Sequence, residues 1–204
     1  MIGLRIIGLT GQTGSGKSYV SSILAENGAY IIDADEIAHD IILKGKGAYN
    51  ELIEYFGDEI KGEDGEICRK TLGNIVFSCG GEKLDFLNRC THKYIYDEME
   101  KEIKQAESIN CHIAVIDAPL LIEGNFINLC GEVWVVFASP EKRAERIMKR
   151  DSITYKQALD RMSRQKKWEE YKKFADVVID NSGDNGNLKE QVYNALKAGK
   201  NNAV

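Results

Sequence analysis

Four residues near the start of the sequence, Gly11, Gly16, Lys17 and Ser18, have the spacing of a phosphate-binding loop, G-x-x-x-x-G-K-[ST]. A polyphosphate needs several backbone N–H groups turned towards it at once. Glycine permits the φ values and the close approach that this requires, and Gly14 is expected to serve the same purpose. The pattern therefore predicts a site for the phosphates of a nucleotide.

The last two residues of this pattern are expected to do the charged chemistry. Lys17 is placed to reach the β and γ phosphates, and Ser18 to offer its hydroxyl to Mg²⁺. Ser18 also opens a helix, whose N-terminal dipole favours negative charge. The residues expected to bind the nucleotide are Gly11, Thr13, Gly14, Ser15, Gly16, Lys17, Ser18 and Tyr19.

The segments on either side favour this interpretation over a glycine-rich turn that only joins a strand to a helix. Ile6, Ile7 and Leu9 form a short apolar run of the kind that makes a buried strand. After the loop, apolar residues recur at helical spacing until Gly28, which is expected to end the helix. A strand before the loop and a helix after it are what the motif requires.

The composition is that of a globular α/β protein. At 204 residues with 43% hydrophobic content, the chain is long enough to bury a core, and one domain with insertions is expected. No apolar run approaches the roughly 20 residues that span a bilayer. Residues 1–5 lead directly into the first expected strand without the layout of a signal peptide, so we expect a cytoplasmic protein that binds no membrane.

The cysteines indicate neither a disulfide framework nor a zinc site, because they are odd in number and include no C-x-x-C pair. We expect reduced thiols that are mostly buried. The five are Cys68, Cys79, Cys90, Cys111 and Cys130.

Charge is distributed unevenly along the sequence. The net charge is −5, but residues 141–173 contain twelve Lys and Arg against six Asp and Glu, a local +6 that leaves −11 for the remainder. The acidic balance argues against general nucleic-acid binding. The basic segment predicts side chains that close over phosphates. The alternative for any residue there is a solvated helix face stabilised by pairs of opposite charge.

Two carboxylates follow the second expected strand, at residues 29–32. Asp33 and Asp35 come at its carboxyl end, where ligands bind in open parallel sheets. One of them is also expected to cap the helix that follows, over residues 36–43. Asp35 is the better candidate for the cap, which leaves Asp33 for the ligand.

A long helical insertion interrupts the alternation of strands and helices between residues 45 and 110. Helical spacing recurs there over 48–56, 69–77, 84–91 and 94–106. Such a block between strands predicts an inserted substrate-binding subdomain.

Strands return after the insertion. The strand expected at 113–116 ends in Asp117, the usual place of the second acidic residue that helps to hold Mg²⁺ in phosphate-loop proteins. Two more strands are expected at 133–137 and 175–179, and Pro140 starts a helix between them. The alternation predicts a parallel, doubly wound sheet and thus an α/β fold.

Taken together, these residues resemble the dephospho-coenzyme A kinase family over nearly the whole chain. The phosphate loop alone indicates only a nucleoside triphosphate site. The run Asp117-Ala118-Pro119-Leu120-Leu121-Ile122-Glu123 and the run from Ala175 to Asn181 narrow it to this family. Further matching residues are Asp33 to Asp35, His39, His92, Arg146 to Asp151, Arg161 and Gln165.

The sequence departs from the usual pattern of that family at three positions. Gln12 and Thr13 stand where the family usually has glycine and isoleucine, and Lys93 stands where proline usually follows the histidine. None replaces a side chain expected to bind phosphate. The departures therefore bear on the local geometry of the loop and of one helix start.

The resemblance implies a phosphate-loop NTPase fold in three parts. These are a core with a five-stranded, doubly wound parallel sheet, a helical domain for the coenzyme A portion of the acceptor, and a helical lid that closes on ATP. The core maps to residues 1–44, 112–139 and 174–204, the acceptor domain to 45–111, and the lid to 140–173.

The resemblance also implies transfer of the γ-phosphoryl group of ATP, with Mg²⁺, to the ribose 3′-hydroxyl of dephospho-coenzyme A. Lys17 would neutralise the β and γ oxygens, Asp33 would orient or deprotonate the hydroxyl, and Arg150 would stabilise the transferring group. Arg146 would bind the nucleotide, while Ser18 and Asp117 would hold the metal. No protein partner is indicated.

Two other functions fit part of the sequence. Another small-molecule kinase of the same fold would share the loop and the lid and differ only in its acceptor. A GTPase-like switch is the second alternative. Against it, the position where an Asp-x-x-Gly element is expected reads Asp117-Ala118-Pro119-Leu120, and the sequence contains no Asn/Thr-Lys-x-Asp guanine-reading motif.

Overall fold

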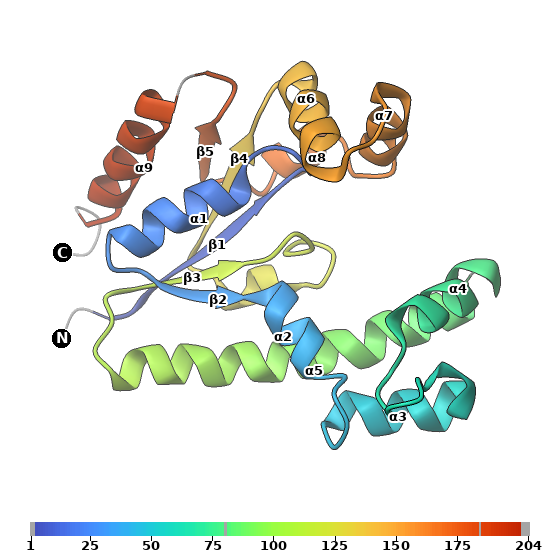
Figure 1. The fold of residues 1–204 in the computed structure, drawn as a ribbon. Helices are drawn as coiled ribbons and strands as arrows, with labels where there is room; N and C mark the ends of the chain where they lie inside the picture. The colour runs from blue at the N-terminus through green and yellow to red at the C-terminus, as the bar shows by residue number, and fades with distance from the viewer. Residues whose placement is uncertain (1–2, 80, 184, 201–204) are drawn as a thin grey trace. The chain divides into compact units, whose positions relative to one another are not determined.

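The structure, a computed structural model, describes residues 3–79, 81–183 and 185–200. The predicted core and acceptor domain also include residues 1–2, 80, 184 and 201–204, which lie outside the described residues. Five strands form one sheet in the order β2-β3-β1-β4-β5 (Figure 1). Their bounds are β1 Arg5–Gly11, β2 Tyr30–Asp33, β3 Ile113–Asp117, β4 Glu132–Phe137 and β5 Val177–Asp180.

Helices connect these strands and form most of the insertion, which also contains an isolated antiparallel bridge between Lys61 and Ile67. They are α1 Lys17–Glu26, α2 Ala34–Asp40, α3 Gly47–Phe56, α4 Arg69–Cys79, α5 Glu82–Ser108, α6 Pro140–Asp151, α7 Tyr155–Ser163, α8 Trp168–Lys172 and α9 Asn185–Lys200, with the 3₁₀ helices η1 Asp58–Ile60 and η2 Phe126–Leu129. The chain divides into two compact units, residues 1–32 with 105–204, and residues 33–104. The three-part division into core, acceptor domain and lid assigns functions to segments, and it stays a prediction.

Strand β1 pairs in parallel with β3 on one side and with β4 on the other, and β4 pairs in parallel with β5. Figure 1 shows β2 beside β3 and pointing the same way. Leu9 of β1 lies opposite Asp117 on β3 and Trp134 on β4. Because the strands are parallel, their carboxyl ends lie at one edge of the sheet. The predicted α/β fold with a five-stranded parallel sheet is confirmed.

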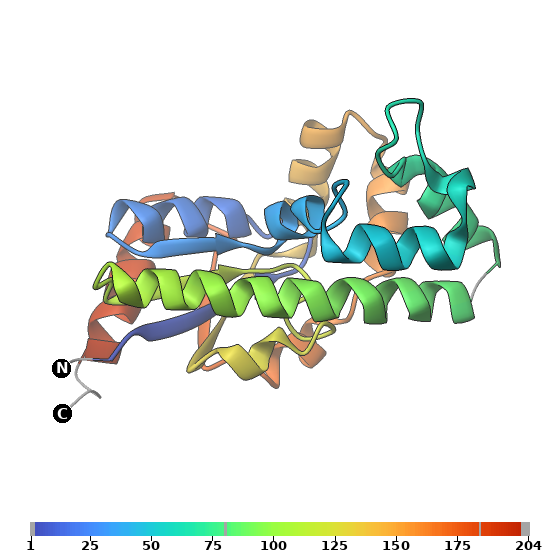
Figure 2. The ribbon, with the colours of Figure 1, turned by 90° about the horizontal axis from the view of Figure 1, so that it is seen from below.

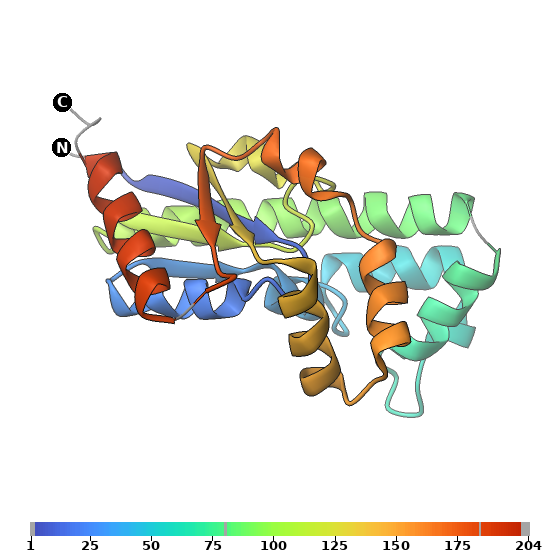
Figure 3. The same cartoon turned by 90° about the horizontal axis from the view of Figure 1, so that it is seen from above.

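Helices α1 and α9 pack side by side over one face of this sheet (Figures 1 and 3). Each has apolar residues at helical spacing, so one side of the helix is buried against the strands. Trp134 of β4 is fully buried in the resulting core. The core residues are Ile7, Leu9, Val20, Ile23, Leu24, Ile113, Val115, Trp134, Val136, Ile179, Leu188, Val192 and Leu196.

Residues 118–130, which include η2, return over the other face of the sheet from β3 towards β4 (Figure 2). Gly8 of β1 makes their close approach possible, because an added Cβ would stand 2.7 Å from both Leu121 Cδ2 and Cys130 Sγ. Leu121 and Phe126 are buried. This connection brings the chain from β3 past β1 to β4.

One continuous helix, α5, replaces the two helices expected at 84–91 and 94–106. The expectation of two helices is wrong because nothing between residues 82 and 108 breaks a helix: this stretch contains neither proline nor glycine, and Lys93 follows His92. Helix α5 is long but strongly polar. Among the described residues, no helix combines the length and the apolar character needed to cross a membrane.

The expectation that most cysteines are buried is wrong for those whose side chains the structure describes. Only Cys90 is buried, whereas Cys68, Cys111 and Cys130 are half-buried, and all four are free thiols. Burial of the sulfur raises the pKa of the Cys90 thiol to about 12, and it raises that of Cys130 to about 12 as well. These two thiols therefore stay protonated at neutral pH.

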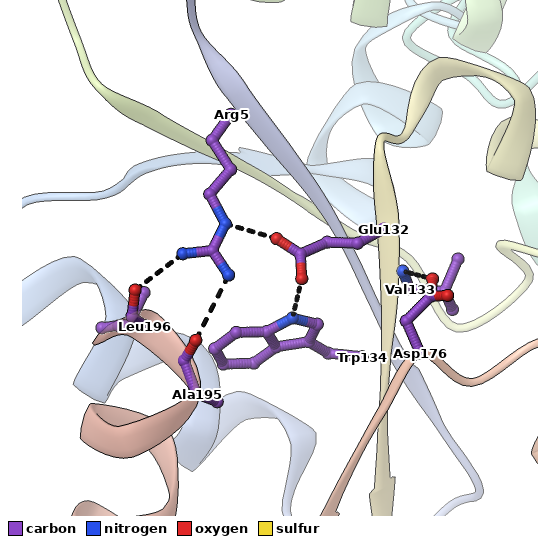
Figure 4. A network of polar contacts seen from close by, with 7 residues as sticks. All are labelled: Arg5, Glu132, Val133, Trp134, Asp176, Ala195 and Leu196. Atoms are coloured by element: carbon purple, nitrogen blue, oxygen red, sulfur yellow. Dashed lines mark hydrogen bonds and ion pairs between the residues drawn. The ribbon is translucent and has the colours of Figure 1, made fainter. Parts of the chain in front are cut away.

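A polar network fastens α9 to the start of the sheet (Figure 4). The Arg5 guanidinium on β1 donates to the carbonyls of Leu196 (2.8 Å) and Ala195 (3.3 Å), near the carboxyl end of α9. Arg5 also forms an ion pair with Glu132 on β4. The other oxygen of Glu132 accepts a hydrogen bond from Trp134 Nε1 (3.1 Å). Arg5 thus joins two strands and a helix.

We expect Arg5→Met to lower the free energy of unfolding by about 2 kcal/mol, because it leaves the half-buried Glu132 without its ion-pair partner and removes the two hydrogen bonds to α9. Urea unfolding followed by circular dichroism measures this change. The control is Lys101→Met, which removes the exposed Lys101–Glu98 pair (2.7 Å) and should cost less than about 0.5 kcal/mol. Equal losses in the two variants would contradict the role given to Arg5.

Candidate active site

The loop between β1 and α1 depends on two glycines in the left-handed region, Gly14 (φ 77°) and Gly16 (φ 92°), the latter the N-cap of α1. At Gly14 an added Cβ would stand 2.7 Å from the carbonyl oxygen of Arg143. At Gly16 it would stand 2.1 Å from Asn181 Nδ2. Glycine is therefore needed at both positions so that the rest of the protein can pack around the loop. This need is separate from the close approach of a ligand.

Ser15 contributes a buried hydroxyl inside the loop. The residue is 1% exposed, and its Oγ has no hydrogen-bond partner among the described residues. Gly11 makes room for it, because an added Cβ there would stand 2.8 Å from Ser15 Oγ and 2.6 Å from the carbonyl oxygen of Val136. The turn is thus packed against β4.

Lys17, the first residue of α1, forms an ion pair with Asp117, the last residue of β3. The two side chains are only 16% and 7% exposed, so each charge depends on the other for stabilisation. The sheet fixes the position of this carboxylate, since the N–H of Ala118 donates to the carbonyl of Leu9 (3.1 Å). The structure thus brings together the predicted phosphate-binding lysine and one of the predicted metal ligands.

Arg146 on α6 holds the carbonyl groups of the loop. Its NH1 donates to the carbonyls of Ser15 (3.1 Å) and Gly14 (3.3 Å), and its NH2 donates to the carbonyl of Asn181 (2.9 Å). The Asn181 amide in turn donates to Ser15 O (2.7 Å). Because the Ser15 carbonyl is held on the outer side, the N–H of Gly16 in the same planar peptide unit points the opposite way. The predicted binding of the nucleotide by Arg146 stays a prediction.

Arg143, one helical turn before Arg146, lies behind the loop. Its Nε donates to the carbonyl of Thr13 (2.9 Å), and its NH1 donates to Gln12 Oε1 (2.6 Å). Gln165 Oε1 accepts from Arg143 NH2 (3.3 Å) and from the Thr13 N–H (2.8 Å). Burial lowers the pKa of the Arg143 guanidinium, which nevertheless stays charged at neutral pH.

Arg150 lies at the exposed carboxyl end of α6. Its guanidinium donates to Asp151 through Nε (2.8 Å) and NH2 (2.9 Å), and Arg161 of α7 pairs with the same carboxylate. Hydrogen bonding from Arg150 lowers the pKa of Asp151, and the same contact raises the pKa of Arg150. Figure 3 shows α6 and α7 as an antiparallel pair. The catalytic role of Arg150 stays a prediction.

Asp33 is the N-cap of α2, which corrects the expectation that Asp35 caps this helix. Oδ1 of Asp33 accepts hydrogen bonds from the backbone N–H groups of Asp35 (2.8 Å) and Glu36 (3.1 Å). The helix begins at Ala34, directly after β2, so Asp35 lies in its first turn. Asp33 is nevertheless exposed. The same carboxylate therefore combines a structural contact with an open surface.

Lys93, which departs from the family's usual proline, takes part in a cluster between α3 and α5. Glu51 accepts hydrogen bonds from Tyr94 Oη (2.5 Å) and from Lys93 Nζ (3.1 Å). The Tyr94 hydroxyl, followed by Lys93, lowers the pKa of the Glu51 carboxyl. Lys93 therefore continues α5 where proline would end it, and it ties this helix to α3.

Sequence reasoning missed the contacts that hold the loop from behind. From the sequence, Gln12 is only a departure from the family pattern, and Gln165 is only a match to it. Arg143 is only one of the charges of the basic segment. The available signal was the position of Arg143 beside Ala144 and four residues before Ile147, which are both fully buried. A charged residue on the buried side of a helix indicates a specific polar partner.

The parallel sheet and the glycine-rich turn between β1 and α1 define a phosphate-loop NTPase. A family model described as dephospho-CoA kinase matches residues 5–187. The chain therefore belongs to the dephospho-CoA kinase family, as its motifs predict.

Individual relatives agree with this assignment. A dephospho-CoA kinase from Carboxydothermus hydrogenoformans is 46% identical over 200 residues, which cover 98% of this chain and 97% of the relative. Among solved structures, the protein TT1252 from Thermus thermophilus has a TM-score of 0.82 at 28% identity and covers 96% of this chain and 97% of its own. A dephospho-CoA kinase from Campylobacter jejuni has a TM-score of 0.70 at 26% identity, with 94% and 95% covered.

We expect Gly16→Ala to lower turnover by about 10²-fold, because displacement of Asn181 by the new Cβ would misplace the loop. Gly28→Ala is a matched control: Gly28 has a similar φ of 84°, but an added Cβ would meet no described atom within 4 Å. Both variants bear the left-handed strain of roughly 1–2 kcal/mol. Steady-state kinetics, measured where both variants are equally folded, separates the backbone strain that they share from the displacement of Asn181 that only Gly16→Ala causes. Equal turnover in both variants would contradict the role of the Asn181 contact.

Proposed function

We propose that this protein transfers the γ-phosphoryl group of ATP to the ribose 3′-hydroxyl of dephospho-coenzyme A, giving coenzyme A and ADP. The observation that carries the proposal is membership of the dephospho-CoA kinase family across residues 5–187, with a relative of that name 46% identical over almost all of the chain. The geometry of the phosphate loop agrees with ATP as the donor. Another acceptor, the alternative left by the loop alone, has no comparable support.

In this proposal the loop binds the phosphates through the N–H groups of Gly14, Gly16, Lys17 and Ser18, while Arg146 and Asn181 hold its carbonyls outward. Lys17 leaves Asp117 and donates to the β and γ oxygens. The transition state of phosphoryl transfer is loose, so positioning and neutralisation of charge supply most of the catalysis. The loop would supply the positioning, and its cations would supply the neutralisation of charge.

The residues present suit Mg²⁺, because Asp117 and Ser18 both offer oxygen donors to a cation that uses one or two protein ligands beside the phosphates. Bound Mg²⁺ would neutralise charge on the β and γ oxygens. Within the part of the chain that the structure describes, no group of three or more His, Cys, Asp or Glu residues forms a separate metal site. Asp117 would exchange the ammonium group of Lys17 for the metal, and its buried charge would thus remain paired.

Asp33 is the proposed acceptor-side residue, because it ends β2 at the ligand-binding edge of the sheet and is exposed. It would orient the ribose hydroxyl and take up its proton late in the transfer. Residues 45–111 would bind the coenzyme A portion, and residues 140–173 would close over ATP and exclude water as an acceptor. A cytoplasmic location, with no nucleic-acid or protein partner, completes the proposal.

The direct test is a reaction of the purified protein with ATP, Mg²⁺ and dephospho-coenzyme A, in which coenzyme A and ADP are measured together. Equal amounts of the two products are expected. Lys17→Ala is the control for contaminating kinases, since it removes the charge that faces the phosphates and should abolish transfer. Because this change also leaves the buried Asp117 unpaired, circular dichroism checks that the variant is folded. ADP formed without coenzyme A, or turnover retained in Lys17→Ala, would overturn the proposal.

Asp33→Asn should lower turnover by about 10²–10⁴-fold, the range of a positioned acid–base group. Asparagine caps helices about as well as aspartate, so this change keeps the α2 cap and isolates the loss of the carboxylate. Asp35→Asn, two residues along, is the matched control and should cost little. Steady-state kinetics with ATP affinity checked separately decides the point, and a loss confined to Asp35→Asn would exchange the two roles.

Arg150 lies on the same side of α6 as Arg143 and Arg146, because the three are spaced by three and four residues. Since the other two contact the loop, Arg150 is placed one turn further along that side. We expect Arg150→Ala to lower turnover by about 10³-fold or more, as for a charge-stabilising arginine. Lys149→Ala, an exposed neighbour on the same helix, should leave turnover unchanged. A loss below about tenfold for Arg150→Ala would make it a surface residue only.

A further inference from the structure

Arg143 is a buried cation whose hydrogen-bond partners among the described residues are all neutral. The residue is 5% exposed, and its hydrogen bonds go to the Thr13 carbonyl (2.9 Å) and to the amide oxygens of Gln12 (2.6 Å) and Gln165 (3.3 Å). No carboxylate of the described chain lies within 4.0 Å of its guanidinium nitrogens, in contrast to Arg5 and Lys17. A buried charge without a counter-ion is costly, so its place in the fold calls for a reason.

Arg143 lies directly behind the phosphate loop. Gln12 and Thr13 are loop residues, and the backbone of Arg143 itself approaches Gly14 so closely that a Cβ there would stand 2.7 Å from the Arg143 carbonyl oxygen. In surroundings from which water is excluded, a charge acts over longer distances than in solvent. The positive charge of Arg143 is therefore directed at the ligand that the loop binds.

Gln12, where the family usually has glycine, is what accommodates Arg143 in this chain. Its Oε1 accepts from Arg143 (2.6 Å), and its Nε2 donates to the carbonyl of Lys166 (2.8 Å), so both ends of the amide are used. Gln165 next to Lys166 accepts from the Thr13 N–H (2.8 Å). The loop is thus tied to both α6 and the segment after α7, through contacts that a glycine at position 12 lacks the side chain to make.

We propose that Arg143 is a positioning residue for phosphate binding, and that the phosphates of the bound nucleotide are the counter-charge that its buried guanidinium lacks. The proposal rests on the assignment of the loop as the ATP site. It adds a residue that touches no substrate and acts through Thr13 and Gln12. The ligand it favours is a polyphosphate, irrespective of the base or of the acceptor.

The first test measures binding of inorganic tripolyphosphate by titration calorimetry, without acceptor, to the wild type, Arg143→Lys and Arg143→Met. Loss of the charge in Arg143→Met should weaken binding by about tenfold or more, as for a lost hydrogen-bonded charge. Arg143→Lys keeps a positive charge but only part of the hydrogen bonding, so it should bind tripolyphosphate less tightly than the wild type and more tightly than Arg143→Met. Tripolyphosphate affinity equal to that of the wild type in Arg143→Met, or an equal loss in both variants, would overturn the proposal.

Gln12→Glu supplies the missing counter-charge from within the chain. The new carboxylate pairs with Arg143 but loses the hydrogen bond that Gln12 Nε2 donates to the Lys166 carbonyl (2.8 Å). Tripolyphosphate affinity should therefore fall by about tenfold, and Gln12→Glu should lower the unfolding midpoint more in the Arg143→Met background than in the wild type. Equal changes of midpoint in the two backgrounds, or an unchanged affinity, would contradict the proposal, and the affinity of Gln12→Glu still decides the matter if Arg143→Met does not fold.

These binding measurements stay separate from the test of the proposed function. Turnover with dephospho-coenzyme A depends on the acceptor, whereas tripolyphosphate binding depends only on the loop and its supports. A protein that binds tripolyphosphate as proposed but fails to make coenzyme A would retain the role of Arg143 and lose the proposed acceptor. The reverse result would retain the acceptor and remove Arg143 from phosphate binding.

Discussion

The close packing of the phosphate loop against its own protein is the constraint on which the site depends. Gly14 and Gly16 are left-handed, and a Cβ at either would overlap with α6 or with Asn181. That packing lets Arg146 and Asn181 hold the loop carbonyls from outside. A peptide group whose carbonyl is fixed has a fixed N–H as well, because the unit is planar. The loop is thereby organised for an anion before one is bound.

Among the described residues, three cations lie at this loop, and they differ in how their charges are balanced. Lys17 is paired with the buried carboxylate of Asp117. Arg146 is satisfied by carbonyls. Arg143 is buried among neutral acceptors. In the proposed function, a polyphosphate would draw Lys17 away from Asp117 and supply negative charge to the loop, while a metal ion would take the place of Lys17 at Asp117.

The strained and charged loop and the contacts that stabilise the fold lie in different parts of the sheet. The apolar core lies between the strands and helices α1 and α9, and the Arg5 network fastens α9 at the far, amino-terminal end of β1. The loop is at the carboxyl-terminal end of the same strand. Hydrophobic burial and well-paired charges elsewhere thus offset the free-energy cost of strain and unpaired charge at one end of the sheet.

The sequence by itself determined the features that local patterns encode: the phosphate loop, the five strands, the helix begun by Pro140 and the family. Glycine spacing and apolar runs are local, so no contact had to be known. Local rules also misplaced the α2 cap and divided α5 in two. Only the tertiary structure decided that Asp33 is the cap, that Lys17 meets Asp117, and that Gln12, Arg143 and Gln165 meet behind the loop. These contacts join residues as much as 152 positions apart. The burial of a charge such as that of Arg143 likewise depends on the packed fold.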